Sequence, residues 1–270
     1  MLCDFQRSKP INVVTKLLAK NYEYLTPEIF KHLRIHYSCQ IKIPDYIIRF
    51  YGLTQNPDTK EVFMVMKYAS HGDLDNNNPK IKILITDFSL SIKVNDTPPE
   101  SIFGTLPYVA PEILCGKTFT TSSDVYSLGI IMTELSSGKA PYEDRLCDSD
   151  LALSIVSTGL RPVFREATPE IFINLAIECL NPSPEKRPTA ETIVSTVKKW
   201  KADLDSKEDS SIKKSFLDSD KLLRTHDNQI IENKTPNSRS FYNKSLEFKN
   251  LPDHSSCKPP RTRIIRSGKV

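Results

Sequence analysis

Residues 85–112 read ITDFSLSIKVNDTPPESIFGTLPYVAPE, and the two ends of this stretch decide how the chain folds. At the first end, an apolar run typical of a strand stops at Asp87, which is followed by Phe88 and the small residue Ser89. At the other end, Ala110-Pro111-Glu112 stands twenty-three residues beyond Asp87. A carboxylate at the tip of a strand needs partners, so the flanking sequence determines which chemistry Asp87 supports.

The sequence after this stretch predicts helices. Ser123-Asp124 precede VYSLGIIMTEL (125–135), which is apolar on nearly every face and therefore predicts a fully buried helix. The segment TPEIF occurs at 26–30 and at 168–172, and each copy predicts a helix start, with Thr as the cap and Pro in the first turn. A last helix is predicted from Thr189, with one apolar face formed by Ile193, Val194, Val197 and Trp200.

The sequence before residue 70 is rich in strand patterns. Three segments favour strands, Ile11–Leu18, Ile47–Leu53 and Val62–Tyr68, and Asn56-Pro57-Asp58 predicts a hairpin turn between the last two. The helix that starts at Thr26 is expected to bury a stripe made of Ile29, Phe30, Leu33 and Tyr37. Strands followed by helices indicate an α+β fold with two unlike lobes.

The composition changes after Trp200 to Lys, Ser, Asn, Asp and Pro, so the end of the chain is expected to be mostly disordered. Residues 201–270 carry 15 Lys and Arg against 10 Asp and Glu, whereas the whole chain has a net charge of +4. The globular part is therefore nearly neutral, which argues against nucleic-acid binding by the core. The stretch Lys258–Lys269 holds five basic and no acidic residues, and it suits either a nuclear localisation signal or a solvated tail.

Cysteine usage and hydropathy indicate in which cellular compartment the protein is expected. The six cysteines are scattered and form no C-x-x-C pair, which indicates reduced thiols rather than a disulfide framework or a zinc site. No apolar run approaches the ~20 residues of a membrane span, and the N-terminal MLCDFQRSKP lacks the apolar core of a secretory signal. We therefore expect a cytoplasmic protein that makes no membrane contact.

The order of these features resembles the protein kinase fold: an Asp-Phe-small triplet after a strand, then Ala-Pro-Glu, then an Asp-led buried helix. The resemblance covers about residues 11–200 and favours the tyrosine-kinase-like and serine/threonine branches, and Thr105 before Tyr108 favours serine/threonine specificity. It implies a partial β-rich N-terminal lobe with one helix (1–69), a partial helical C-terminal lobe (70–202) with its activation segment at 87–112, and a disordered basic tail (203–270).

The resemblance also implies a site for ATP and Mg²⁺. Asp87 would hold a Mg²⁺ ion that bridges the ATP phosphates, because a hard cation prefers carboxylate oxygen. Lys16, at the end of VVTK, would bind the α- and β-phosphates. The remaining ATP-binding positions are Met66 at the back of the pocket, Lys67, Tyr68 and Ala69 in the hinge that binds adenine, and Asp73 at the ribose.

Three further residues match structural positions of the family. Glu112 and Arg187, the latter in PSPEKRPTA, match a buried ion pair that joins the activation segment to the C-terminal lobe. Asp124 matches the acid that fixes the catalytic loop from below. The glutamate that pairs with the phosphate-binding lysine aligns with His32 here, and Glu28, one turn away, suits the positive end of its helix better.

Two motifs of the family are missing. No G-x-G-x-x-G stands before Lys16, and only Asp75–Thr86, which read DNNNPKIKILIT, separate Leu74 from Asp87. This interval lacks H-R-D, so neither the Asp that accepts the substrate proton nor the Asn for a second Mg²⁺ is present, and no catalytic residue is assigned. A positioned general base alone is worth roughly 10²–10⁴ in rate. The same gap removes a core helix that is expected to pack on residues 125–135.

Three interpretations stay open. The chain represents a kinase that transfers phosphate from ATP to protein Ser or Thr, with a segment lost through a missed exon or a truncated gene prediction. Alternatively, it is a non-catalytic pseudokinase scaffold, or a product without a stable fold. Protein substrates or signalling partners are expected for the first two. The expected phosphorylation sites are Thr97, Ser101 and Thr105, although the arginine of H-R-D, the usual phosphate partner, is missing.

Overall fold

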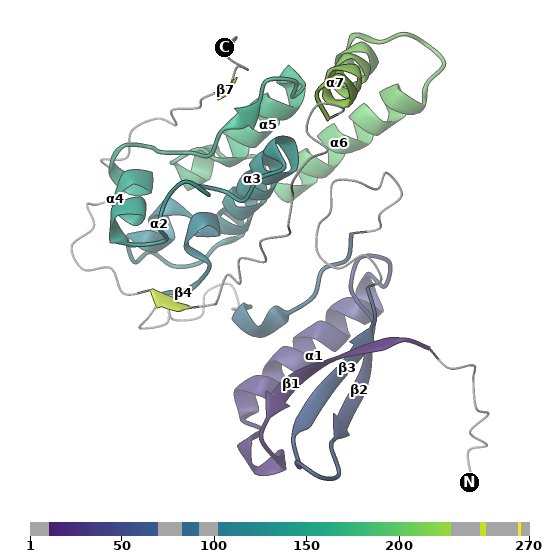
Figure 1. Cartoon of the computed structure of the whole chain (residues 1–270), viewed down its shortest axis with the longest axis vertical. Helices are drawn as coiled ribbons and strands as arrows, with labels where there is room; N and C mark the ends of the chain where they lie inside the picture. The colour runs from purple at the N-terminus through teal and green to yellow at the C-terminus, as the bar shows by residue number, and fades with distance from the viewer. Residues whose placement is uncertain (1–10, 70–82, 92–101, 228–243, 247–263, 266–270) are drawn as a thin grey trace. The chain divides into compact units, whose positions relative to one another are not determined.

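The computed structural model describes residues 11–69, 83–91, 102–227, 244–246 and 264–265 (Figure 1). The chain divides into an N-terminal unit, Met1–Ser91, and a C-terminal unit, Ile92–Val270. The boundary therefore falls after residue 91, whereas the sequence suggested residue 69. The reason is that residues 83–91 contact the helix and strands of the N-terminal unit.

The N-terminal unit is a three-stranded antiparallel sheet with one long helix (Figure 1). The strands are β1 (Val13–Ala19), β2 (Phe50–Gln55) and β3 (Val62–Lys67), in the order β1-β3-β2, and α1 spans Pro27–Lys42 after a short 3₁₀ turn, η1 (Tyr22–Tyr24). The predicted hairpin is present between β2 and β3. Asn56 closes its turn, because its side-chain oxygen accepts the backbone N–H groups of Asp58 at 2.9 Å and Thr59 at 3.2 Å.

Helix α1 begins as its sequence predicts, but its buried face is different. The hydroxyl of Thr26 caps the helix by accepting the N–H of Ile29 at 3.4 Å. The predicted stripe is wrong for Phe30 and Tyr37, which are 47% and 51% exposed. The buried positions of α1 are Leu33, as predicted, and His36, so the core face includes an imidazole that hydropathy alone does not select.

Residues 83–91 form one β-bridge in place of the predicted strand. Ile85 donates its N–H to the oxygen of Tyr46 at 2.8 Å, and its own oxygen accepts the N–H of Ile48 at 3.0 Å. A 3₁₀ turn, η2 (Phe88–Leu90), follows immediately and lies against α1. This bridge fixes Asp87 relative to the sheet.

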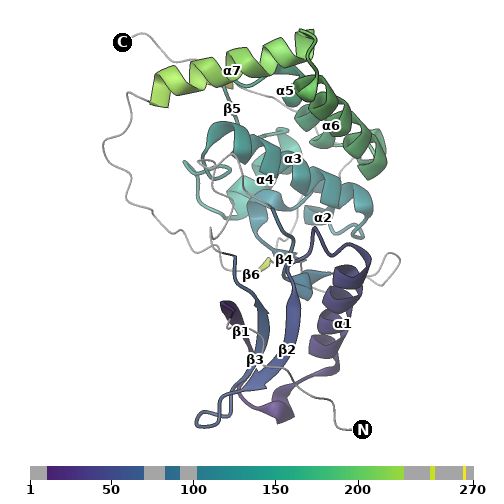
Figure 2. The same ribbon diagram turned by 90° about the vertical axis from the view of Figure 1, so that its right-hand side faces the viewer.

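The C-terminal unit is built mainly from helices (Figures 1 and 2). Its helices are α2 (Pro111–Leu114), α3 (Thr121–Ser137), α4 (Ser149–Ser157), α5 (Glu170–Cys179), α6 (Ala190–Asp205) and α7 (Ser211–Asp227), with 3₁₀ turns η3 (Leu106–Tyr108) and η4 (Pro184–Lys186). Its strands are β4 (Ile102–Gly104), β5 (Phe164–Arg165), β6 (Lys244–Leu246) and β7 (Ile264–Ile265). With the small sheet of the other unit, they give an incomplete α+β kinase-like fold.

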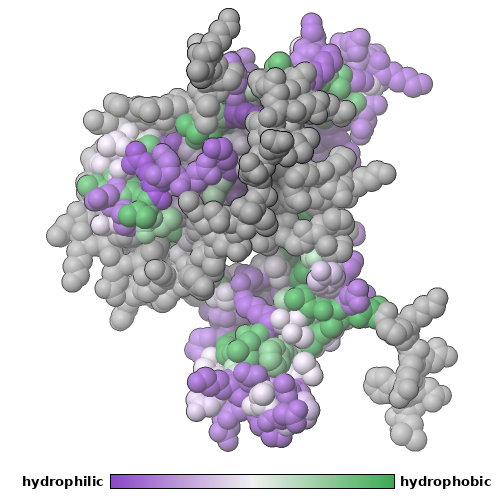
Figure 3. Space-filling view, viewed as in Figure 1, coloured by the Kyte–Doolittle hydropathy of each residue, from purple (hydrophilic) through white to green (hydrophobic). Residues whose placement is uncertain are grey.

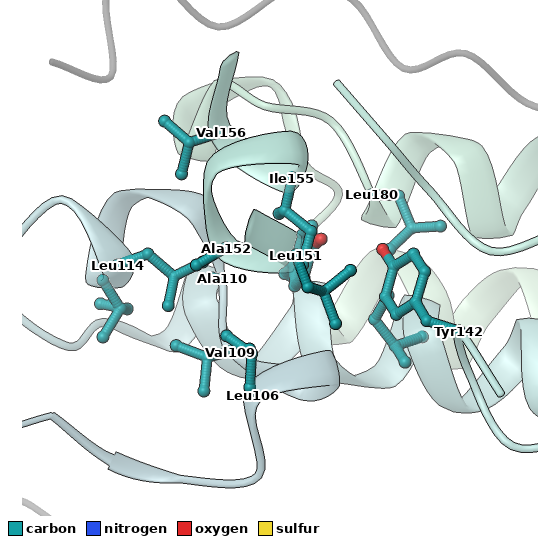
Figure 4. Close-up of a cluster of buried hydrophobic side chains, with 13 residues drawn as sticks. Leu106, Val109, Ala110, Leu114, Tyr142, Leu151, Ala152, Ile155, Val156 and Leu180 are labelled. Carbon is teal, nitrogen blue, oxygen red and sulfur yellow. The ribbon is translucent and has the colours of Figure 1, made fainter. Parts of the chain in front are cut away.

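Helix α3 is the centre of the C-terminal unit and lies between two hydrophobic clusters. Tyr126 and Ile130 belong to the cluster built from residues 106–114, α4 and Leu180 (Figure 4). Val125 and Met132 belong to the cluster built with α5, α6 and Phe164. These contacts on two sides of one helix join the unit into a single core.

The prediction that α3 is buried all round is wrong for one face. Leu128 and Leu135, two turns apart, are 37% and 36% exposed. The elements that contact α3 most extensively are α5, β5, η3 and η4, and they leave this face uncovered. From the sequence, the missing core helix is expected to pack against residues 125–135. Leu128 and Leu135 belong to this range.

The two TPEIF segments do not start their helices in the same way. The hydroxyl of Thr168 donates to the oxygen of Arg165 at 2.7 Å and lies 2.5 Å from the hydroxyl of Ser136, and it does not cap α5. Tertiary contact with α3 therefore replaces the local cap in the second copy.

The end of the chain departs from the prediction twice. On α6, Ile193 and Trp200 are buried, but Val194 and Val197 are 51% and 45% exposed, so half of the predicted face is wrong. The predicted disorder does not hold for residues 211–227, which form α7. Helix α7 is stabilised because the ring of Phe216 packs 5.8 Å from that of Trp200, covering apolar surface that α6 alone leaves open.

A buried ion pair joins α2 to the segment between η4 and α6. The guanidinium of Arg187 binds both carboxylate oxygens of Glu112, at 2.6 and 2.7 Å, and both side chains are almost fully buried. The same guanidinium donates to the oxygens of Asn181 and Ser122, both at 2.8 Å, and lies over the ring of Tyr126. Every side of this charge is therefore satisfied, and the pair implied by the family resemblance is present.

Asp124, in the first turn of α3, has a different environment. No described residue donates a hydrogen bond to its carboxylate. Desolvation raises the pKa of Asp124 above its ordinary value. Asp124 is the acid that the resemblance assigns to fixing the catalytic loop. In the described part of the chain, its carboxylate therefore has no hydrogen-bond donor.

Replacing Glu112 with Gln should lower the free energy of unfolding by about 3–5 kcal/mol, because it leaves the buried guanidinium of Arg187 without its counter-charge. The matched control is Asp218→Asn, which breaks the exposed pair with Lys221 and should cost at most about 1 kcal/mol. Urea unfolding followed by circular dichroism gives both values. Equal losses in the two variants would contradict the assignment of the buried pair.

Replacing Asp124 with Asn should raise the stability at pH 7, by at most about 1 kcal/mol for a partly exposed group. A raised pKa in the folded state means that ionisation disfavours folding, so the penalty applies above the folded pKa and disappears as the pH falls below the unfolded value. The gain should therefore shrink towards pH 3 in urea unfolding. A stability loss at pH 7, absent from the control Asp205→Asn, would show that the ionised carboxylate has a partner.

Candidate functional site

Lys16 and Asp87 form the centre of the candidate site in the N-terminal unit. The Nζ atom of Lys16 lies 2.6 Å from Oδ1 of Asp87, and their side chains are 43% and 44% exposed. Lys16 is on the edge strand β1, where it pairs with Met64 of β3. The sheet thus positions the ammonium group, and the Ile85 bridge positions the carboxylate.

The backbone of Asp87 has an uncommon conformation for a residue with a side chain. Its φ and ψ angles are 61° and 73°, in the left-handed region. Such conformations cost of order 1 kcal/mol or more and are enriched at functional sites. Ser89, two residues on, stands where the family usually has glycine, and it helps to lower the pKa of the Asp87 carboxyl.

The charge of Asp87 follows from these contacts. Burial acts to raise the pKa of the carboxyl, but the hydrogen bonds from Lys16 and Ser89 and the positive charge of Lys16 outweigh it, so the pKa lies below the ordinary value. Asp87 is therefore ionised at neutral pH, as a cation ligand must be.

A cavity of about 130 Å³ adjoins the pair. Its walls are apolar except for the ion pair, the hydroxyls of Thr86 and Ser89, and two histidines of α1; the residues that line it from α1 and β3 are Ile29, His32, Leu33, His36, Met64 and Met66. Typical small-molecule sites measure ~300–1,000 Å³, so this cavity is smaller than a site for a drug-sized ligand. In Figure 3, hydrophobic residues also gather on the visible face of the N-terminal unit, where residues of β1 are exposed.

His36 supports the segment that carries Asp87. Its Nε2 atom lies 2.8 Å from the oxygen of Ile48, which requires the N–H of the ring at this nitrogen. The ring meets that of Phe88 edge-on at 5.2 Å and that of Phe50 at 6.0 Å. The aromatic contact holds Phe88 and so fixes the residue before it. His36 continues the helical period of Ile29 and Leu33, which would have predicted its burial. His36 is absent from the stripe predicted from the sequence because its side chain is polar.

The position of His32 agrees with its alignment to the family glutamate, since His32 lines the same cavity as Lys16. The ammonium group pairs with Asp87 instead of with a carboxylate from α1. Glu28 lies at the start of α1, where a backbone N–H and the hydroxyl of Thr26 lower its pKa. It therefore stabilises the helix end, as expected, and does not line the cavity.

The other predicted positions are only partly described. Met66 is buried in the cavity wall, and Thr86 donates its hydroxyl to the sulfur of Met66 at 3.6 Å. Tyr68 and Ala69 follow β3 and are exposed. Asp73, Thr97 and Ser101 lie outside the described residues. Thr105 is half-buried between β4 and η3 in the C-terminal unit.

A second contact, missed in the sequence, fixes the end of the activation segment. The hydroxyl of Tyr108 donates to Oε2 of Glu134 at 2.8 Å, and its backbone oxygen accepts the hydroxyl of Ser127 at 2.7 Å. Burial and the neighbouring Glu134 carboxylate raise the pKa of Tyr108 well above its ordinary value, so it stays a donor. The only sign of this contact in the sequence is that Glu134 is an acidic residue within the apolar helix segment 125–135.

Two further observations concern metals and membranes. Across the described ranges, no group of three or more His, Cys, Asp and Glu side chains is arranged to hold a metal ion. Mg²⁺ commonly takes one or two carboxylates and completes its shell with phosphate and water, so Asp87 alone fits that role. The described helices include none with the length and apolar character of a membrane span.

Comparison with known proteins identifies a family for the middle of the chain. Residues 74–198 match the protein kinase domain. The chain is 35% identical over 120 residues to a probable serine/threonine-protein kinase of Dictyostelium discoideum, an alignment that covers 44% of this chain and 7% of that protein. It is 33% identical over 122 residues to the mitogen-activated protein kinase kinase kinase 10 of Homo sapiens, covering 45% of this chain and 13% of that protein.

Another alignment is longer. The chain is 26% identical over 220 residues to the mitogen-activated protein kinase kinase MST7 of Pyricularia oryzae, covering 61% of this chain and 52% of that protein. The chain thus spans about half or less of the length of each of these relatives. Because residues 74–198 match the kinase domain and the relatives are named as protein kinases, this chain is a member of the protein kinase family.

Proposed function

We propose that this chain binds a magnesium–adenine nucleotide through Lys16 and Asp87, and that it transfers phosphate to protein serine or threonine very slowly or not at all. It then acts in signalling as a nucleotide-sensitive interaction module rather than as an efficient enzyme. The observation that carries the proposal is the 2.6 Å pair between Lys16 and the ionised Asp87 at the cavity, in a chain that has no H-R-D between Leu74 and Asp87.

The two charges of the pair suit the two halves of a magnesium nucleotide. Lys16 presents a compact ammonium group, which favours a phosphate oxygen, and Asp87 presents carboxylate oxygens, which favour a hard cation. When bound, Mg²⁺ neutralises phosphate charge, which is its usual contribution in kinases. Since Lys16 and Asp87 neutralise one another in this structure, a nucleotide and its cation would replace one ion pair with two.

The same residues do not supply the proton chemistry of transfer. The substrate hydroxyl must lose a proton to a positioned base, and the residues of the N-terminal cavity offer no carboxylate besides Asp87. The twelve residues Asp75–Thr86 contain a single acid, Asp75, adjacent to three asparagines and without the histidine and arginine of the family motif. Slow transfer follows from this gap.

The parts of the kinase pattern that are present in the C-terminal unit favour a binding role. The activation-segment end is held by the Glu112–Arg187 pair and by Tyr108–Glu134, so this surface is ordered without the catalytic loop. Relatives are named as kinases of mitogen-activated cascades, and we propose protein partners of that signalling type for this chain. A cytoplasmic location, or a nuclear one through the basic stretch 258–269, stays a prediction.

Mg–ATP should raise the melting temperature of the whole chain. At a free concentration ten times the dissociation constant, linkage gives about 1.4 kcal/mol, or roughly 3–6 °C for a protein of this size. Lys16→Met should remove the shift with and without Mg²⁺, whereas Asp87→Asn should remove only the part that EDTA also removes. Lys20→Met, an exposed lysine just after β1, is the control and should shift like the parent. The absence of any shift at millimolar Mg–ATP would refute nucleotide binding.

Phosphate transfer to a generic protein substrate should be at least ~10²-fold slower than for a complete kinase, because the base is missing. The measurement is incorporation from γ-labelled ATP by the purified chain, with Asp87→Asn as the blank. Incorporation indistinguishable from this blank agrees with a scaffold role. A signal that Asp87→Asn abolishes, at a rate typical of kinases, would show that the chain recruits a base from elsewhere.

A further inference from the structure

The C-terminal tail supplies a strand to the activation segment. β6 pairs with β4 in antiparallel orientation, with Ile102 opposite Leu246, Phe103 opposite Ser245 and Gly104 opposite Lys244. Figure 1 shows the yellow strand of the tail beside β4. Residues separated by some 140 positions in the sequence are thus joined through their main chains.

β6 is the one strand that pairs with β4 among the described residues. β4 leads directly into Thr105 and η3, whose residues Leu106 and Pro107 are buried in the core. One end of the paired segment is therefore fixed to the helices, while its hydrogen-bonding edge is closed only by the tail. An unpaired edge is a template for another strand, so the occupant of this edge decides whether a partner can use it.

A second strand of the tail holds it to the same unit. β7 pairs in parallel with β5, with Phe164 opposite Ile264 and Arg165 opposite Ile265. β5 is firmly seated, because Phe164 is fully buried and the N–H of Arg165 donates to the hydroxyl of Ser136 at 3.3 Å. The β6–β4 contact is intramolecular, and the second attachment at β7 restrains the tail and so raises the effective concentration of β6 near β4.

We propose that residues 244–246 act as a built-in strand that closes the edge of the activation segment and holds residues 102–105 in a covered conformation. A pairing of three residues is weak by itself, since short two-stranded ribbons are marginally stable in water. The tail therefore releases the segment readily. This inference does not depend on nucleotide binding, which resides in the other unit.

The test uses the full-length chain with prolines in β6. Alternate residues of a strand direct their N–H groups to the partner, so prolines at two consecutive positions, Lys244→Pro with Ser245→Pro, must remove one ladder donor whichever register applies. The control, Ser238→Pro with Arg239→Pro, also removes one serine and one basic residue from the tail but lies outside β6. Far-UV circular dichroism should be the same in both variants.

Hydrogen–deuterium exchange of a peptide covering residues 102–105 is the readout. The β6 variant should exchange there about tenfold faster than the parent, and the control should match the parent. Adding the synthetic peptide FYNKSLEFKN, residues 241–250, should restore protection in the β6 variant, while a scrambled peptide should not. Unchanged exchange in the β6 variant, or equal effects of the two peptides, would overturn the proposal.

Discussion

The buried Glu112–Arg187 pair is the interaction on which the C-terminal unit depends. It connects residues 75 positions apart, and its guanidinium also binds the backbone at Asn181 and Ser122. A buried charge pair adds little net stability, but it is costly to leave half-formed. The pair therefore selects one arrangement of α2, α3 and the segment before α6, and it holds the end of the activation segment in place even though the catalytic loop of the family is missing.

The N-terminal unit depends on a smaller and more exposed contact. Lys16 and Asp87 meet because the edge strand and the Ile85 bridge bring them together, and His36 and Phe88 fix the strained backbone at the acid. Each of these features stabilises the position of a charge and contributes little to the core. This arrangement is the basis of the proposed nucleotide binding, and the sequence between Leu74 and Asp87 contains no H-R-D.

Local chemistry explains which elements were predictable from the sequence. Thr26, Asn56 and Thr189 fold as expected because caps and turns depend on neighbouring residues. Long-range contacts were predictable only through the family pattern, as for Glu112 and Arg187. The errors at Phe30, Val194, Val197 and Leu128 share one cause: an apolar residue is buried only if another element covers it. Helix α7 shows the converse, since its polar composition concealed Ile212 and Phe216, the apolar residues that pack against the core.

The docking of α7 also gives the protein an internal reporter. The chain contains a single tryptophan, Trp200, and its indole ring lies between Phe172 of α5 and Phe216 of α7. The emission of this one fluorophore therefore depends on whether α7 is seated. Detachment of the appended helix would admit water to the indole and shift its emission to the red, separately from any event in the N-terminal unit.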